Sequence, residues 1–132
     1  MTDKPLPQPD RDSTPYWEGI AAGELRLQRC ADCGAWRWPA RAICNRCRSF
    51  AAEWVKASGL GTVVSWIRTH QSFIRSFAED IPYVTVEVQL DEQADIRLIG
   101  RLAEPSIAPE IGTRVRAEFT HDPALVVWRP IA

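Results

Sequence analysis

The sequence predicts a mostly β fold made of an N-terminal helical arm, a zinc ribbon and a five-stranded antiparallel barrel. Three observations support this prediction. All four cysteines fall in two Cys-x-x-Cys pairs within residues 30–47. From about Phe50 onward, apolar and polar residues alternate with a period of two, which is typical of half-buried strands. A short apolar stripe at helical spacing precedes the cysteines.

Residues 1–11 are predicted to be a flexible arm, because three prolines at alternate positions disfavour both helix and sheet. Residues 12–24 are predicted to contain a docking helix that Pro15 begins and Gly23 ends. Its apolar stripe consists of Tyr16, Trp17, Ile20 and Ala21. A helix of about eight residues is too short to be stable alone. It must therefore pack, either on its own domain or on a partner, and the sequence leaves both open.

The four cysteines are predicted to bind one structural zinc ion at residues 25–49. These ligands are Cys30, Cys33, Cys44 and Cys47. Two tight turns bring four soft sulfur ligands to the corners of a tetrahedron, the geometry that Zn²⁺ accepts. Other cysteine chemistry fits less well. A disulfide framework is typical of secreted chains, and no signal peptide is visible. A redox Cys-x-x-Cys pair opens a helix in a βαβ unit, whereas here two pairs flank a short loop. A catalytic zinc keeps an open coordination position, and four cysteines leave none.

Residues 50–132 are predicted to form the barrel. Residues 51–57 are expected to be an entry strand, and five strands follow at about residues 62–70, 81–90, 96–102, 113–119 and 125–129. Five half-buried strands with turn-rich joints in this length suit an OB-fold, whereas an immunoglobulin-like sandwich would need about seven.

Charge and hydropathy narrow the possible partners. The formal net charge of -1 gives no general electrostatic case for nucleic-acid binding. Arginines are concentrated in residues 24–48, where they offset the thiolate charge or meet an anionic ligand or acidic partner. No apolar run approaches the roughly 20 residues of a membrane span, and no apolar signal core opens the chain. We therefore expect a cytoplasmic protein without a membrane segment.

Several short motifs, taken in order, match a known family. They are Tyr16-Trp17-Glu18-Gly19, Gly23-Glu24-Leu25, Cys30-x-x-Cys33-Gly34, Pro39, Cys44-x-x-Cys47, Gly61-x-Val63-x-Ser65, Pro82-Tyr83 and Arg129-Pro130. From about residue 12 to the C-terminus the chain resembles the zinc-ribbon/OB-fold proteins of the domain-of-unknown-function 35 family, also called acyl-CoA-associated OB-fold proteins. The resemblance implies a helical arm, a rubredoxin-like zinc ribbon with the four cysteines as ligands, and an OB barrel.

The resemblance also implies a working context. Members of this family accompany thiolase-superfamily enzymes, including thiolases, hydroxymethylglutaryl-CoA synthases and lipid-transfer-type enzymes of sterol side-chain degradation. In the sterol case the two chains together resemble a retro-aldolase acting on a β-hydroxyacyl-CoA. The implied role of this chain is to form the hetero-oligomeric complex and to help hold or channel the acyl-CoA.

The chain itself has no evident active site. Claisen and thiolytic chemistry needs a nucleophilic thiol with an acid/base partner, and the zinc prediction uses every cysteine. His70 and His121 are expected to be solvated or structural, and no nucleophile elbow or phosphate loop is present in the sequence. We therefore expect a non-catalytic accessory subunit.

Contacts to CoA and to the partner are predicted from residue chemistry. Arginines suit the CoA phosphates and aromatic rings suit the adenine. The expected CoA contacts are Trp36, Arg37, Arg46, Trp66, Arg68 and Phe73. As an alternative, the tryptophans form a seam between ribbon and barrel and the arginines are solvated. The expected partner interface combines the helix with the apolar 71–81 segment, through Tyr16, Trp17, Ile20, Phe73 and Phe77.

Two other functions remain open from the sequence. An OB barrel can bind single-stranded nucleic acid through aromatic and basic side chains, here Trp66, Tyr83 and Arg97. The overall charge and the scarcity of lysine argue against it. The third function is a purely structural subunit that never contacts CoA.

Overall fold

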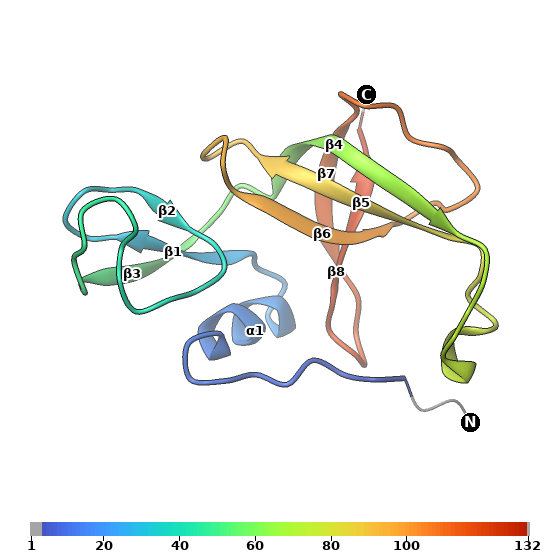
Figure 1. Cartoon of the computed structure of the whole chain (residues 1–132), viewed down its shortest axis with the longest axis horizontal. Helices are drawn as coiled ribbons and strands as arrows, with labels where there is room; N and C mark the ends of the chain where they lie inside the picture. The colour runs from blue at the N-terminus through green and yellow to red at the C-terminus, as the bar shows by residue number, and fades with distance from the viewer. Residues whose placement is uncertain (1–3, 132) are drawn as a thin grey trace.

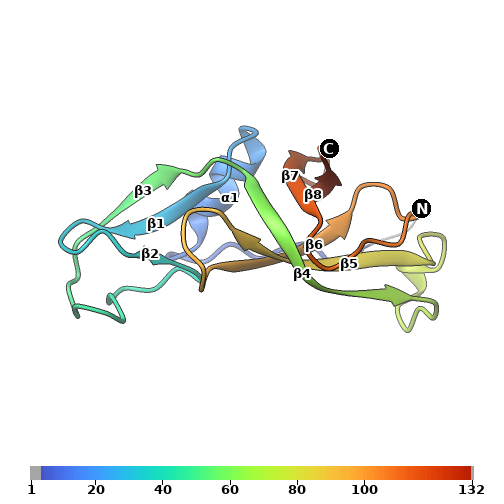
Figure 2. The same ribbon diagram turned by 90° about the horizontal axis from the view of Figure 1, so that it is seen from above.

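The computed structural model describes residues 4–131, which form a small ribbon sheet and a closed barrel side by side (Figures 1 and 2). The ribbon sheet has the strand order β2-β1-β3 and the barrel has the order β4-β5-β6-β8-β7. The elements are α1 (Thr14–Ala21), β1 (Arg26–Cys30), β2 (Trp36–Arg37), β3 (Ala52–Lys56), β4 (Leu60–Thr69), the 3-10 helix η1 (Arg75–Phe77), β5 (Tyr83–Leu90), β6 (Arg97–Leu102), β7 (Arg114–Phe119) and β8 (Val126–Pro130). No helix within residues 4–131 has the length and apolar character that crossing a membrane requires.

Helix α1 packs on its own chain. Tyr16 and Ile20 are buried members of the main hydrophobic core, and the helix contacts β1. Gly23, with a φ of 78°, ends the helix in a left-handed conformation that glycine adopts without strain. The structure therefore decides between the two alternatives that the sequence left open for the packing of α1.

The predicted flexible arm is partly anchored. Residues 1–3 of this arm lie outside the described residues. The Nζ atom of Lys4 lies 2.6 Å from a carboxylate oxygen of Asp80, in the connection between β4 and β5. Figure 1 shows the arm running past α1 toward that connection.

Strand β3 belongs to the ribbon sheet. The sequence predicted an entry strand of the barrel here, but β3 pairs antiparallel with β1 from Arg26↔Lys56 to Cys30↔Ala52. A strand has two edges with backbone hydrogen-bonding groups, and the two-residue strand β2 covers only part of one edge of β1. The other edge of β1 also carries backbone groups that need hydrogen-bond partners, and β3 supplies them.

The barrel core follows the predicted alternation. On β5, Val84, Val86, Val88 and Leu90 are buried, as expected from the period-two pattern. The bulkiest fully buried side chain is that of Trp128 on β8. Val115 on β7 is also fully buried, and Ala117 and Phe119 pack against the core from partly buried positions.

One pairing in the barrel is parallel. Four neighbouring pairs are antiparallel, whereas β6 and β8 run parallel through Arg101↔Val127 and Leu102↔Trp128. The prediction of a wholly antiparallel barrel is therefore wrong for this pair. A closed ring with an odd number of strands cannot alternate in direction throughout, so at least one neighbouring pair must be parallel.

Candidate metal centre and barrel groove

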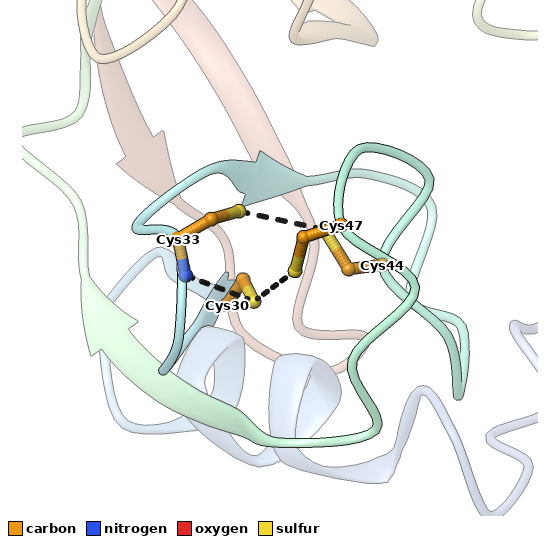
Figure 3. A group of neighbouring side chains, drawn as sticks. All are labelled: Cys30, Cys33, Cys44 and Cys47. Carbon is orange, nitrogen blue, oxygen red and sulfur yellow. Dashed lines mark hydrogen bonds between the residues drawn. The ribbon is translucent and has the colours of Figure 1, made fainter.

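The four cysteine sulfurs form a compact cluster between two turns (Figure 3). All four Sγ atoms lie within 4.8 Å of one another. The Cys30 and Cys47 sulfurs are 3.5 Å apart, and those of Cys33 and Cys44 are 3.7 Å apart. In a tetrahedral site with a metal–sulfur distance of about 2.3 Å, neighbouring sulfurs lie about 3.8 Å apart. The cluster therefore has the dimensions of a four-sulfur metal site.

Backbone N–H groups point at these sulfurs. The Cys33 N–H donates to Cys30 Sγ and the Arg46 N–H donates to Cys44 Sγ, each at 3.4 Å. Backbone donation from Cys33 lowers the pKa of Cys30, and donation from Cys47 and Arg46 lowers the pKa of Cys44 to about 6. Near neutral pH these donors favour the thiolate form that binds metals.

The fourth sulfur shows why the cluster suits a cation. The backbone N–H of Ser49 lowers the pKa of Cys47, but the adjacent Cys30 thiol, burial, and then the thiols of Cys33 and Cys44 outweigh it and raise that pKa to about 12. Four sulfurs at these distances cannot all carry negative charge without a positive ion between them. Four protein sulfurs at these distances complete a tetrahedron and leave no position open for a further ligand.

A side-chain contact links the two turns. The Ser49 hydroxyl donates to a carboxylate oxygen of Asp32, which lies between the first two cysteines. The same hydroxyl accepts a hydrogen bond of 2.9 Å from the N–H of Ala51. Ser49 therefore connects the first turn to the chain that follows the second turn.

Three of the predicted CoA contacts lie at the junction of ribbon and barrel. Trp36 is half-buried and packs against the main core. Arg37 is only 2% exposed, and its Nη1 donates to the carbonyl oxygen of Arg41 at 2.6 Å. Arg46 lies 3.4 Å from the Asp95 carboxylate at the surface. Trp36 thus occupies the ribbon–barrel seam that the sequence offered as its alternative position.

The other three predicted CoA contacts lie elsewhere on the barrel. Trp66 and Arg68 are in the second half of β4, with the Arg68 guanidinium 5.8 Å from the Trp66 ring centroid. Phe73 projects from the β4–β5 connection and is 89% exposed. Figure 1 shows that connection at the end of the barrel remote from the ribbon sheet. The six residues are therefore divided between two distant places.

The predicted interface residues differ in accessibility. Tyr16 and Ile20 are 4% and 1% exposed, and burial raises the pKa of Tyr16 to about 12. Their side chains pack inside the chain, so we do not retain them as partner contacts. Trp17 is half-buried, with its ring edge-on to Tyr16 at 4.9 Å. Phe77 is also half-buried, beneath Lys4 and Arg101.

The structure shows a groove that sequence reasoning missed. A cavity of about 590 Å³ lies between α1, strands β5 and β6, and the β7–β8 connection. Its apolar lining includes Trp17, Phe77, Tyr83, Ile99 and Leu125. A second cavity of about 450 Å³ adjoins it, because both are lined by Tyr83, Arg101, Thr120 and Val127. We call the two cavities together the barrel groove. Volumes of this size are typical of small-molecule sites.

Arg101 stands where the two cavities meet. Its guanidinium carbon is 4.0 Å from the Tyr83 ring centroid and 5.5 Å from that of Phe77. Arg101 Nη1 lies 3.0 Å from Asp80 Oδ2, the oxygen that also receives Lys4. Hydrogen bonding from Lys4, followed by that from Arg101, holds the pKa of Asp80 below its usual value. The groove therefore has two cations and one carboxylate at one end of an apolar surface.

The signal that links these residues is the strand register. Thr85 on β5 pairs with Arg101 on β6, and Glu87 pairs with Ile99. The sequence identifies the two strands by alternation, but only their register places Ile99 and Arg101 on the same outer surface as Tyr83.

A four-sulfur ribbon joined to a closed five-stranded barrel defines a zinc-ribbon/OB-fold protein. Two family models match the chain, the "ChsH2, rubredoxin-like zinc ribbon domain" over residues 17–53 and the "ChsH2, C-terminal OB-fold domain" over residues 54–120. The chain belongs to this ChsH2 family, and the resemblance to the domain-of-unknown-function 35 (DUF35) proteins is confirmed.

Similar curated proteins are subunits or scaffolds. The chain is 34% identical to the 3-oxo-4,17-pregnadiene-20-carboxyl-CoA hydratase alpha subunit of Mycobacterium tuberculosis, over 94% of this chain and 39% of that protein. It is 36% identical to a probable enoyl-CoA hydratase alpha subunit of Thermomonospora curvata, over 96% and 40% respectively. The chain thus spans about two fifths of the length of these relatives. A DUF35 domain-containing scaffold protein of Methanocaldococcus jannaschii is 35% identical, over 69% of this chain and 64% of that protein.

Two solved structures share the fold. A chain of the Ltp2-ChsH2(DUF35) aldolase superposes with a TM-score of 0.83 and 36% identity, over 95% of this chain and 98% of that chain. A DUF35 protein of unknown function from Sulfolobus solfataricus superposes with a TM-score of 0.66 over 92% of this chain and 86% of that chain. Its identity is 15%, so this second likeness concerns the fold alone.

Proposed function

We propose that the chain is a non-catalytic accessory subunit that binds a thiolase-superfamily partner and helps to hold the acyl-CoA substrate of that partner. The observation that carries the proposal is the likeness, over 95% of this chain, to a chain of a two-component aldolase. Two further relatives are named as hydratase subunits, one of a carboxyl-CoA and one of an enoyl-CoA. These names support a CoA thioester as the substrate class.

The chemistry of the chain supports a non-catalytic role. All four thiols lie in the metal cluster, which removes them as nucleophiles. Within residues 4–131, neither His70 nor His121 forms a side-chain hydrogen bond with a group that could orient it as a base. The bond-making steps would therefore belong to the partner.

We propose Zn²⁺ as the ion of the cysteine cluster, because four sulfurs at tetrahedral spacing suit it. Zinc bound there would contribute folding free energy and no reaction step. The ribbon would then be a rigid platform whose position is set by its contacts with the barrel.

We propose that the barrel groove holds the acyl part of the substrate. Its lining is mostly aromatic and aliphatic, and its size suits an acyl chain. Arg46 remains a predicted contact for the CoA phosphates, since its guanidinium group is at the surface, whereas Arg68 lies at the distant end of β4 and would not contact the same CoA. Arg37 does not remain a candidate, because it is buried and its Nη1 is bonded within the ribbon.

The nucleic-acid alternative has few free contacts in this structure. The Tyr83 ring, which would have to stack on a base, is covered by the Arg101 guanidinium at 4.0 Å. Arg97 is paired with Glu87 at 3.1 Å. Both residues are therefore already engaged by neighbours within the barrel.

The groove assignment is tested by a matched pair of substitutions in the assembled complex. Ile99 lines the groove and is 67% exposed, whereas Ile111 is 64% exposed in the β6–β7 connection and does not line it. Ile99→Trp should raise the KM for acyl-CoA by about tenfold, a loss of about 1.4 kcal/mol. Ile111→Trp should leave it within about twofold. Equal KM values for the two variants would contradict the groove as the acyl site.

A further inference from the structure

The β4–β5 connection presents apolar side chains to solvent. Phe73 is 89% exposed, the largest value for any large hydrophobic side chain of residues 4–131. Ile74 beside it is 48% exposed, and Ile67 near the end of β4 is 62% exposed. An apolar group of this kind on a surface loop marks an interaction site more often than a structural one.

The loop is held in place by its own contacts. The hydroxyl of Ser72 donates to the carbonyl oxygen of Ile74, and the N–H of Phe77 donates to the same carbonyl at 3.0 Å. The Phe77 ring lies beneath the cations of Lys4 and Arg101, at 5.6 and 5.5 Å from its centroid. Phe77 therefore anchors the loop, and Phe73 is directed outward from an ordered support. Such preorganisation lowers the entropic cost of binding.

Two arginines flank the exposed apolar residues Phe73 and Ile74 in the sequence. Arg68 and Arg75 form no ion pair with an acidic group among residues 4–131. Asp80 is engaged by Lys4 and Arg101, which leaves Glu79 as the nearby carboxylate of the same connection. The surface around Phe73 therefore has free cationic groups that a partner with carboxylates would complement.

We propose that this tip, formed by Phe73 and Ile74 with Arg68 and Arg75, docks into an apolar pocket of the partner that carries carboxylates on its rim. The inference rests on the proposed function, and it adds which side chains dock and what chemistry receives them. Phe73 is the buried anchor of the contact. The two arginines contribute to steering and to register at the rim, where exposed ion pairs affect the association rate more than the affinity.

A protein pocket fits the tip better than the other surfaces it could meet. Each arginine near an anionic membrane contributes about 1 kcal/mol, and with one exposed aromatic ring this gives only weak attachment. Two copies of this chain that met tip to tip would bring like charges together, which is unfavourable. An apolar pocket with carboxylates complements both features at once.

Phe73→Ser against Phe50→Ser is the matched test. Both rings are exposed, Phe50 by 74% in the ribbon segment before β3, so neither change removes core packing. The 132-residue chain is titrated by calorimetry with each thiolase-superfamily protein of the same genome. Phe73→Ser should weaken the Kd by at least about 30-fold, as at an interface hot spot, and Phe50→Ser by less than about threefold. Equal Kd values for Phe73→Ser and wild type overturn the inference.

The charged rim has its own pair of variants. Arg75 lies at the tip, whereas Arg116 lies on the exposed side of β7, so Arg75→Glu and Arg116→Glu form a matched pair. Arg75→Glu should lower the association rate at low salt by about tenfold and reduce its salt dependence. Arg116→Glu should change neither. Identical rates for both variants overturn the carboxylate-rimmed pocket.

The outcomes separate this inference from the proposed function. If wild type binds a thiolase-superfamily protein and Phe73→Ser binds it equally well, only the tip is wrong. If wild type binds none of them, the proposed function fails and the tip with it. Sedimentation with phosphatidylserine vesicles that depends on Phe73 would overturn the partner pocket and show that the tip binds a membrane. A dimer in solution that depends on Phe73 would overturn it and show that the tip binds a second copy of the chain.

Discussion

The side-chain amide of Gln93 lies alongside the backbone of Trp36 and forms two hydrogen bonds with it. The Trp36 N–H donates to Gln93 Oε1 at 2.9 Å, and Gln93 Nε2 donates to the Trp36 carbonyl oxygen at 3.0 Å. Trp36 is in the ribbon strand β2, and Gln93 is in the hairpin between β5 and β6. One barrel side chain therefore continues the hydrogen-bonding edge of the ribbon sheet and fixes the metal centre relative to the barrel.

Removal of this amide should loosen the ribbon from the barrel. Gln93→Ala leaves the Trp36 backbone groups without partners, at a cost of about 1–3 kcal/mol in the free energy of unfolding. Urea denaturation measures that cost, and residual dipolar couplings report whether the two units still share one orientation. Gln89→Ala is the control, because Gln89 forms no side-chain hydrogen bond within residues 4–131. An unchanged stability and an unchanged orientation in Gln93→Ala would show that Gln93 does not fix the ribbon relative to the barrel.

Loss of one sulfur should release the metal. Cys44→Ser removes a buried ligand of the cluster, and metal binding at such sites is worth an apparent 10–16 kcal/mol or so in folding free energy. Elemental analysis should give one zinc per chain in wild type and none in Cys44→Ser. In NMR spectra of Cys44→Ser the amide signals of the ribbon should lose their dispersion. Asn45→Ala, at the adjacent exposed position, should keep its zinc. A full equivalent of zinc in Cys44→Ser would show that the cysteine cluster is not the metal site.

Asp80 should make the free energy of unfolding depend on pH in the acidic range. Its pKa is lowered in the folded chain, chiefly by hydrogen bonding from Lys4 and then from Arg101. A group with a lowered folded pKa contributes its stability above the unfolded pKa, near 4 for an aspartate. That contribution is lost as the pH falls through the folded pKa.

The Asp80 contribution is measurable as a difference between variants. Asp80→Asn should cost about 1–2 kcal/mol of unfolding free energy near pH 7, because two cations lose a carboxylate whose side chain is 20% exposed. The difference from wild type should shrink toward zero as the pH falls through the lowered pKa of Asp80 in the folded chain. Glu79→Gln, the adjacent exposed carboxylate, should show neither effect. A difference that stays constant with pH would mean that Asp80 acts through packing alone.

Gly100 should tolerate no side chain. A Cβ at this position on β6 would lie 2.9 Å from Trp128 Nε1 and 3.1 Å from the carbonyl oxygen of Val126. Gly100→Ala should therefore cost about 1–3 kcal/mol of unfolding free energy through overpacking. In a Trp128→Phe background the cost should be smaller, because the indole nitrogen is absent. A double-mutant cycle measures this coupling, and additive costs would show that the clash is not with the indole ring.

The local features were predictable because each depends on residues close in sequence. The cysteine spacing predicted the metal cluster, Pro15 and Gly23 predicted the ends of α1, and alternation predicted the inward face of β5. Turn chemistry and side-chain periodicity act over a few residues, so they can be recognised without knowledge of the fold.

The features that were missed depend on which strand lies beside which. Strand β3 directly precedes the barrel in the sequence, but its position is decided by its pairing with the free edge of β1. The barrel groove exists because register places Ile99 and Arg101 beside residues of α1 and the β7–β8 connection. Tyr16 and Trp17 are adjacent aromatic residues that both line the groove, and only the packing of α1 buries the first and leaves the second half-buried.

The rate of acyl-CoA cleavage by the thiolase-superfamily partner, titrated with this chain, tests the central claim most directly. We predict no turnover by the chain alone, and a partner rate that rises with added chain to a plateau at a fixed stoichiometry. Turnover by the chain alone, or a partner rate that does not respond to the chain, would contradict it.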